Sequence, residues 1–566
     1  NRGLWWFCDN GRGWHQSKTI GACQLVRDGD ELQMVLNLLA EPVKYESKDP
    51  IVFGLMAHPA RPVPETYRLI ERCSPEENDW ASSQYGSVFK PWVYPPTAGE
   101  MKVFPPVKAP VGQERDWQPP ATRSEQIEAS WKYAESCVPA MKDMQPTGTR
   151  TLYLSKWWLS CRAGQYDGWA WRSGPSGNAT MTTSFVDYLC WEMNEWIGRG
   201  IYDAVYLDET YETRALNLEA GFGCRLPDGS VQPGIDNFGL RELLKRWRNL
   251  FTAHGVRPAL LSHNTRSFAY HAHIFCESWL DGENSPIVAL GSQWLDRTSK
   301  QRMENLQNGR MWGLGTFWMP YISEGGFKSE DSQFPKWQWR QARQAQSQFA
   351  HYETATVYEG QGAGVYRRYW NDVLGWGAGD PDKVPFHAYW NNAPYLAARR
   401  RELAAHEIEG TRPEGPVEHQ WVPGHTGKLL VSFYRKSDSG ALLMIVSNHT
   451  ARPVLAEIEL NAEKLPLPDG AKARSLDSTF NPPPGPDYEP AKARKESKEL
   501  IEDTESILDM GLDDGGMGAD LGEIAEMVQK DPARDQRRKE LYVPRLDGRT
   551  VKTAIRARDY RVIVIE

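Results

Sequence analysis

Two pairs of carboxylates follow short apolar runs, at a spacing that suits proton-transfer chemistry. Asp208 and Glu209 come directly after one run, and Asp281 and Glu283 follow another. Two carboxylates in different surroundings can divide the roles of acid and base or nucleophile between them, because their pKa values are pushed apart. We therefore expect acid/base chemistry at these four residues.

Polar and aromatic side chains accompany these acidic pairs. Some have structural alternatives: the Trp residues can fill a core, His263 can be a satisfied core histidine, and Arg214 can pair with a nearby carboxylate. The candidate substrate-binding residues are Trp157, Trp158, Tyr206, Arg214, His263, Asn264, Glu277, Trp279, Trp318 and Tyr321.

The composition is rich in aromatic rings that carry a polar group, with 24 Trp and 23 Tyr beside 17 Phe. Such rings suit surfaces that are half in contact with water. A sugar presents apolar C–H faces edged by hydroxyl groups. Trp and Tyr platforms among Asp, Glu, Asn and His therefore favour a saccharide site over simple core filling.

Charge and cysteine usage argue against several other kinds of site. The net charge of −8 gives no basis for non-specific nucleic-acid binding, which requires a basic surface. No segment approaches the roughly 20 apolar residues that cross a bilayer, so we expect no membrane insertion. The eight Cys lack CxxC or Cys/His metal spacing, so we expect no metal and no other cofactor, while disulfides remain open.

The secondary structure expected along the chain determines where these residues lie. Residues 1–80 are expected to form strands. The apolar runs Gly3–Cys8, Glu31–Leu39 and Ile51–Met56 are separated by polar turns, which predicts the C-terminal part of a β-sandwich. The Pro-rich stretch His58–Pro64 cannot continue a central strand, so a domain boundary is expected there.

Residues 81–412 alternate apolar runs with amphipathic stretches, which is typical of βα units around a parallel sheet. Helices are expected at Thr183–Arg199 and Asn237–His254, where apolar residues recur at helical spacing. The length fits an α/β fold of the (β/α)8 TIM-type barrel, which takes about 250 residues. A doubly wound sheet is the alternative, although its Gly-rich phosphate loop is missing. The expected strands are Phe89–Tyr94, Thr151–Ser155, Ala204–Leu207, Pro258–Ser262, Ile274–Cys276 and Gly315–Trp318.

Residues 413–566 return to strands and predict a C-terminal antiparallel β-sandwich. A polar segment over residues 482–540 interrupts it, and its composition cannot bury a core, so we interpret it as a mobile insertion. Within it, Ser497–Met510 has a helical pattern, and Asp513-Asp514 lacks the ligand spacing of a calcium loop. The expected strands are Lys428–Tyr434, Ala441–Ser447, Leu455–Leu460 and Arg561–Ile565.

A barrel gathers the loops that follow its strands at one face, where active sites lie. Glycosidic cleavage needs one acid for the leaving oxygen and a second group that acts as nucleophile, activates water, or steadies a nucleophile within the substrate. The alternative is that these carboxylates only cap helices or pair with Arg214. Three polar clusters after three apolar strands favour the catalytic interpretation.

The passage Phe53–Pro64, followed by a barrel with a Tyr-Leu-Asp-Glu strand end, resembles glycoside hydrolase family 123 and its less characterised relatives. The resemblance spans residues 1–410 and implies hydrolysis of N-acetylhexosaminides. It implies that Asp208 steadies the substrate's acetamido group during attack and that Glu209 is the general acid/base. The second acidic pair has no counterpart there, which leaves open a two-carboxylate mechanism on another sugar.

We therefore expect a secreted or periplasmic glycoside hydrolase whose partner is a glycan. No signal peptide begins at Asn1, so we expect any targeting segment to have been removed. The alternative is a non-catalytic carbohydrate-binding barrel. A polysaccharide lyase is disfavoured, because it needs a base beside cations rather than acidic pairs. Sugar, anomer and oligomeric state stay open.

Overall fold

The computed structural model divides into two compact units. Unit 1 comprises Asn1–Pro64, Tyr85–Leu280 and Arg310–Leu314, and unit 2 comprises Glu65–Gln84, Asp281–Gly309 and Gly315–Glu566. The structure describes residues 3–15, 19–40, 44, 50–62, 87–88, 123–144, 149–155, 180–208, 210, 214–215, 218, 221–225, 229–263, 270–281, 303–304, 309–318, 336–356, 365–409, 411, 420–423, 428–480 and 532–566.

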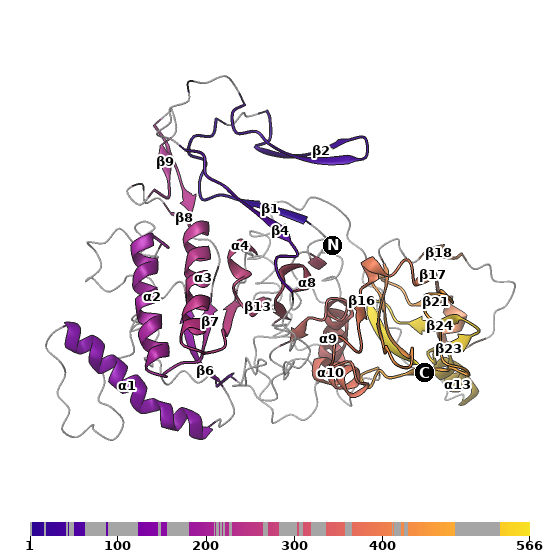
Figure 1. Ribbon diagram of the computed structural model, residues 1–566. Helices are drawn as coiled ribbons and strands as arrows, with labels where there is room; N and C mark the ends of the chain where they lie inside the picture. Colours follow the sequence, from indigo (N-terminus) through magenta and orange to yellow (C-terminus); the bar gives the residue numbers. More distant parts are fainter. Residues whose placement is uncertain are drawn as a thin grey trace. The chain divides into compact units, whose positions relative to one another are not determined.

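Two small antiparallel ribbons form the N-terminal part of unit 1. Strand β1 (Gly3–Phe7) pairs with β4 (Gly54–His58), and β2 (Cys23–Asp28) pairs with β3 (Glu31–Leu36). Every residue of β2 is exposed, whereas a sandwich strand buries alternate residues. In the described part of residues 1–80, two separate ribbons therefore stand in place of the expected β-sandwich (Figure 1).

A parallel sheet in the order β5-β6-β7-β12-β13 forms the centre of unit 1. This order follows the chain without reversal, whereas a doubly wound sheet reverses at a switch point. The doubly wound alternative is therefore wrong for these strands, and closure into an eight-stranded barrel stays a prediction. The strands are β5 (Ser87–Val88), β6 (Thr149–Ser155), β7 (Ala204–Asp208), β12 (Leu260–His263) and β13 (Ser278–Asp281).

Helices α2 (Thr183–Gly198) and α3 (Asn237–Ala253) lie side by side and pack on the sheet of unit 1 (Figure 1). Their apolar side chains recur every three or four positions, which makes one buried stripe per helix. The Thr182 hydroxyl accepts from the Phe185 amide at 3.2 Å and begins α2. The shared core includes Phe185, Leu189, Met193, Trp196, Leu240, Leu243, Trp247, Val205, Leu207 and Leu260.

The strand expected at Ile274–Cys276 is wrong by position. This stretch is a turn after α4 (Tyr270–His273), where the Cys276 amide donates to the His273 carbonyl at 2.8 Å. Cys276 is buried in the core that α2 and α3 share, so its apolar character reflects packing and not a strand. Strand β13 begins only at Ser278.

The remaining elements complete unit 1 and the first part of unit 2, where β14 pairs in parallel with β15. They are α1 (Arg123–Met144), β8 (Arg214–Ala215), β9 (Cys224–Arg225), β10 (Val231–Gln232), β11 (Gly234–Ile235), α8 (Gly309–Trp312), β14 (Gly315–Trp318), α9 (Lys336–Phe349), β15 (Ala355–Thr356) and α10 (Val365–Gly375).

Two five-stranded antiparallel sheets follow in unit 2, in the orders β16-β19-β20-β25-β22 and β18-β17-β21-β24-β23. Two of their strands, β16 and β17, lie before residue 413. The elements are β16 (Phe386–His387), η6 (Tyr389–Asn391), β17 (Leu396–Glu402), α11 (Ala405–Glu409), β18 (Val422–Pro423), β19 (Leu429–Arg435), β20 (Leu442–Asn448), β21 (Val454–Leu460), β22 (Ala473–Ser475), α13 (Pro532–Leu541), β23 (Arg545–Asp547), β24 (Thr550–Ile555) and β25 (Asp559–Ile565).

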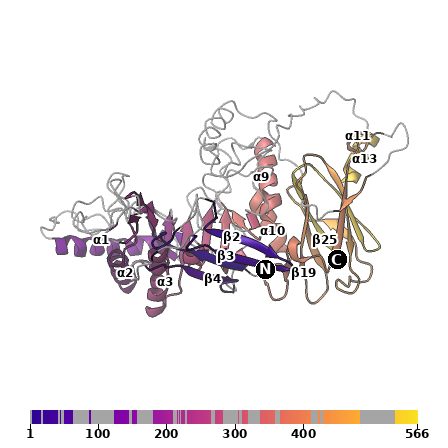
Figure 2. The same cartoon turned by 90° about the horizontal axis from the view of Figure 1, so that it is seen from above.

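The central strands of the first sheet are buried on both faces. In β20, Leu442, Met444 and Val446 face the second sheet, while Leu443 and Ile445 pack in the core of α9 and α10. Side chains alternate along a strand, so a continuous apolar run serves two cores at once. The described part of unit 2 is thus three layers: helices, sheet and sheet (Figure 2).

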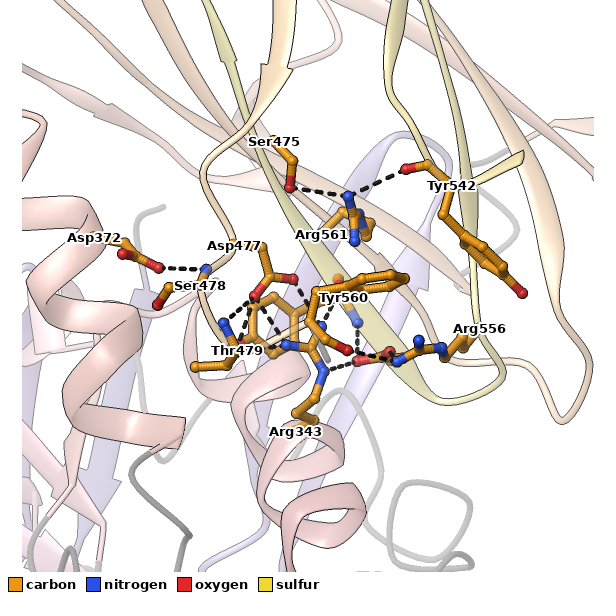
Figure 3. Close-up of polar contacts among 12 residues, drawn as sticks. Arg343, Asp372, Ser475, Asp477, Ser478, Thr479, Tyr542, Arg556, Tyr560 and Arg561 are labelled. Carbon is orange, nitrogen blue, oxygen red and sulfur yellow. Dashed lines mark hydrogen bonds and ion pairs between the residues drawn. The ribbon is translucent and has the colours of Figure 1, made fainter. Parts of the chain in front are cut away.

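A buried arginine ties α9 to the first sheet (Figure 3). The guanidinium of Arg343, 1% exposed, contacts both carboxylate oxygens of Asp477 at 2.9 Å and reaches Asp559 at 2.7 Å. It also donates to the Thr479 hydroxyl and the Tyr560 carbonyl, both at 2.6 Å. Although burial opposes ionisation, the Arg343 charge holds the pKa of Asp477 below its usual range. The charged groups therefore satisfy one another inside the protein.

In the described ranges, free thiols are carried by Cys8, Cys23, Cys190 and Cys276. Among the helices of those same ranges, none combines the length and the apolar character that crossing a bilayer requires.

Candidate functional site

The carboxyl ends of three parallel strands lie side by side in unit 1. Leu261 of β12 is level with Tyr206 of β7 on one side and with Ser278 of β13 on the other. Adjacent strands are about 4.8 Å apart, so the ends of β7 and β13 flank His263, the last residue of β12. This edge is where the site was expected.

Tyr206 and His263 face each other across β7 and β12. Their ring centroids are 5.9 Å apart, and both side chains are 1% exposed. The neighbouring positions Val205 and Leu207 belong to the core on which α2 and α3 pack. Because side chains alternate along a strand, Tyr206 and His263 lie on the face of the sheet opposite to α2 and α3.

Thr210 fastens the chain after β7 to the end of β12. Its amide and its hydroxyl both donate to the His263 carbonyl, each at 2.9 Å. Nε2 of His273 lies 2.9 Å from the Thr210 carbonyl, so His273 donates from that nitrogen. Thr210 and His273 are fully buried. The backbone is therefore fixed immediately beyond the acidic pair.

The structure places the backbone of both leading aspartates at strand ends. Asp208 is the last residue of β7 and is level with Ser155 of β6, and Asp281 is the last residue of β13. Several predicted site residues lie outside the described residues: Glu209, Glu283, Trp157, Trp158, Asn264 and Tyr321.

Glu277 lies at the opposite edge of the sheet from the candidate site. It precedes β13, and its amide donates to the carbonyl of Leu260, the first residue of β12, at 2.8 Å. Its carboxylate, 7% exposed, forms ion pairs with Arg248 and, at 3.4 Å, with Arg61. Strand β13 begins four residues later than the strand expected there, so Glu277 precedes the strand instead of following it. We therefore assign Glu277 to stabilising the fold and not to substrate binding.

Two other predicted residues, Trp279 and Trp318, are buried rings that present no surface to a substrate. Trp279 is 1% exposed and is level with Ser262, on the face opposite to that of His263. Trp318 lies in the core of α9 and α10 in unit 2, where its ring centroid is 5.2 Å from that of Phe349. A buried ring has no free face for a sugar, so we assign both Trp to packing. Arg214 is exposed on the short strand β8.

Sequence reasoning missed a buried polar cluster at the start of α3. The Asp9 carboxylate, which follows β1, accepts from the Phe238 amide at 3.0 Å, while that of Asp236 accepts from the Met181 amide at 3.2 Å. Burial raises the pKa of Asp9 to about 7, and the Asp236 charge adds to this rise. The visible sequence signal was Asp236 just before a helical pattern. Nothing local indicated Asp9, because its partner lies in a distant segment.

His271 of α4 belongs to the same region and predicts a pH dependence of folding. Its ring stacks on Phe7 at 4.2 Å and is 1% exposed. Burial lowers the pKa of His271 from 6.5 to about 4. The unfolded chain therefore gains a proton at His271 before the folded chain does. We expect this residue to cost roughly 3 kcal/mol of stability as the pH falls from 6.5 to 4.

The measurement is the free energy of unfolding against pH for wild type and His271→Phe. The wild type should lose stability relative to the variant over that pH interval. Asp9→Asn is the matched control, because the raised pKa of Asp9 acts oppositely: its contribution is lost as the pH rises from about 4 to 7. A constant difference between wild type and His271→Phe at all pH values contradicts the prediction.

Among the residues that the structure describes, no group of three or more His, Cys, Asp or Glu is arranged to hold a metal ion. No protein-family model matches the chain, and no curated protein matches it. Solved structures do show similarity. The alpha-amylase of Geobacillus thermoleovorans complexed with acarbose has 8% identity and a TM-score of 0.35, over 77% of this chain and 81% of that one.

Two further solved structures have similar values. The Anoxybacillus alpha-amylase has 7% identity and a TM-score of 0.35, over 78% of this chain and 80% of that one. The alfa-galactosidase of Saccharomyces cerevisiae has 9% identity and a TM-score of 0.32, over 76% of this chain and 82% of that one. The chain is thus similar, at very low identity, to solved glycosidases.

Proposed function

We propose that this chain is a glycoside hydrolase that cleaves an oligo- or polysaccharide by carboxylate acid/base catalysis. The observation that carries the proposal is the fixing of the backbone on both sides of Glu209. Asp208 is held in the β6–β7 ladder, and Thr210 is held by two hydrogen bonds to His263. Catalytic groups need such rigid support, because small displacements cost large factors in rate.

The position of Asp208 also supports the proposal. It lies two residues beyond Tyr206, and alternate strand positions share a face. By this alternation, position 208 belongs to the same face of the sheet as Tyr206, opposite to α2 and α3. Asp208 thus ends β7 level with Ser155 of β6, at the carboxyl ends of the parallel strands, which is where the active sites of (β/α) barrels lie.

We assign the roles as the family 123 resemblance implies. Asp208 steadies an acetamido group that acts as internal nucleophile, and Glu209 protonates the leaving oxygen and later activates water. The substrate is then an N-acetylhexosaminide, and the protein acts in a secreted or periplasmic location. Asp281 and Glu283 are the alternative partners if the sugar has no acetamido group, in which case a carboxylate pair completes the mechanism.

The test is hydrolysis of a panel of aryl glycosides by the full chain. The panel pairs each N-acetylhexosaminide with the hexoside that lacks the acetamido group, in both anomers. Turnover of only the acetamido member supports the assigned roles. Turnover of only the simple hexosides favours the two-carboxylate mechanism.

If no member is hydrolysed but saccharides still bind, the non-catalytic binding barrel becomes the better account. Binding is measured by calorimetry with the same glycosides. Absence of both hydrolysis and binding rejects the proposed function.

A further inference from the structure

A groove in unit 2 shares no residue with the catalytic edge described above. It has a volume of about 760 Å³ and lies among η6, β17, β18 and β19. Small-molecule sites typically have volumes of about 300–1,000 Å³. The residues that characterise this β17–β19 groove are Tyr389, Trp390, Arg399, Trp421, Pro423 and Val431.

The groove contains two half-buried tryptophans that neighbouring side chains hold in place. Trp390 stacks on Tyr352 at 5.5 Å and meets the edge of Tyr389 at 4.8 Å. Trp421 lies under the guanidinium of Arg399, with 4.7 Å from the Arg399 Cζ to the ring centroid. Such rigid, partly exposed rings lose little conformational freedom when a ligand binds.

The charge of the groove is compensated. Nε and Nη2 of Arg399 contact one oxygen of Glu457, at 2.7 and 2.5 Å. Lys552 also lies 3.6 Å from the Glu457 carboxylate. The groove therefore offers an anchored hydrogen-bond donor without a large excess of charge, since a guanidinium has five N–H groups. This favours a neutral ligand that carries hydroxyl groups over an anionic one.

We propose that the β17–β19 groove is a second, non-catalytic binding site for a neutral oligosaccharide. Trp390 and Trp421 contact the apolar faces of the sugar rings, and Arg399 donates to hydroxyl groups along their edges. This assignment does not depend on the catalytic roles of Asp208 and Glu209.

The test is calorimetric titration of the full chain with maltotriose, cellotriose and triacetylchitotriose. The Asp208→Asn background limits turnover during the titration. We expect at least one trisaccharide to bind, and Trp421→Ala and Trp390→Ala to raise its Kd by about tenfold or more, because central aromatic residues dominate binding. Trp191→Ala is the matched control, since Trp191 is exposed on α2 of unit 1 and its loss leaves Kd unchanged.

Saccharide binding that neither groove variant weakens overturns the proposal, and so does the absence of binding by all three probes. Circular dichroism of each variant separates loss of binding from loss of fold. The two proposals for this chain fail independently. Hydrolysis by the wild type without any groove binding removes only the second site, whereas groove binding without hydrolysis removes only the first.

Discussion

Replacing Glu209 by Gln is expected to lower kcat by about two orders of magnitude or more on an N-acetylhexosaminide with a poor leaving group. The amide has no proton to give to the leaving oxygen at neutral pH. An activated aryl leaving group needs less protonation, so the loss should be smaller on that substrate. The measurement is kcat for wild type and Glu209→Gln on a leaving-group series of one sugar.

Asp208→Asn separates the two roles of the acidic pair. If Asp208 steadies the acetamido group, its replacement slows every N-acetylhexosaminide by a similar factor, whatever the leaving group. The same dependence on leaving group in both variants would contradict the assigned division of roles. If Glu209→Gln and Asp208→Asn both retain activity while Asp281→Asn or Glu283→Gln loses it, the catalytic carboxylates are those of the second pair.

Glu277→Gln is the discriminating control for this experiment. Its carboxylate pairs with Arg248 and Arg61 at the amino ends of the strands. Its replacement should lower stability, because two cations lose a buried partner, while kcat of the folded fraction stays unchanged. Normalising activity to the folded fraction keeps the two effects apart.

Elements with strong local signals were predicted well. The strand expected at Gly315–Trp318 has the same bounds in the structure, and the helices expected at Thr183–Arg199 and Asn237–His254 differ only at their last residue. The β19, β20 and β25 strands were found because a continuous apolar run of that length fits a strand buried on both faces. Periodicity and run length are local properties, so sequence reveals them.

What sequence could not reveal is pairing between distant segments. The apolar run that ends at Cys276 looks like a strand because it is buried, yet it packs against helices. That single error placed Glu277 after a strand instead of before one. Likewise, Asp9 accepts a hydrogen bond from the amide of Phe238, which lies 229 residues later in the chain. Sequence reasoning could identify candidate site residues at strand ends, but it could not identify the side chains from distant segments that support them.

The second large effect is expected on stability, at the buried Arg343. Arg343→Met removes the cation that Asp477 and Asp559 share and leaves Asp559 only the Arg556 guanidinium at 4.0 Å. Removing one partner of a buried ion pair costs about 3–5 kcal/mol. Both carboxylates lie within 2.9 Å of the guanidinium, and all three side chains are buried, so bulk solvent does not compensate for the lost cation (Figure 3). The measurement is the free energy of unfolding from urea denaturation. Unfolding is monitored through the signal of the β-sheets in unit 2.

Arg340→Met on the same helix is the matched control. Arg340 is exposed, so its replacement should change stability by less than about 1 kcal/mol. The double variant Arg343→Met with Asp477→Asn should recover part of the loss, because a neutral amide costs less to bury than an unpaired carboxylate. If Arg343→Met were no less stable than Arg340→Met, the ion pairs would contribute nothing net. The charge network would then serve to fix the orientation of α9 on the sheet and not to stabilise it.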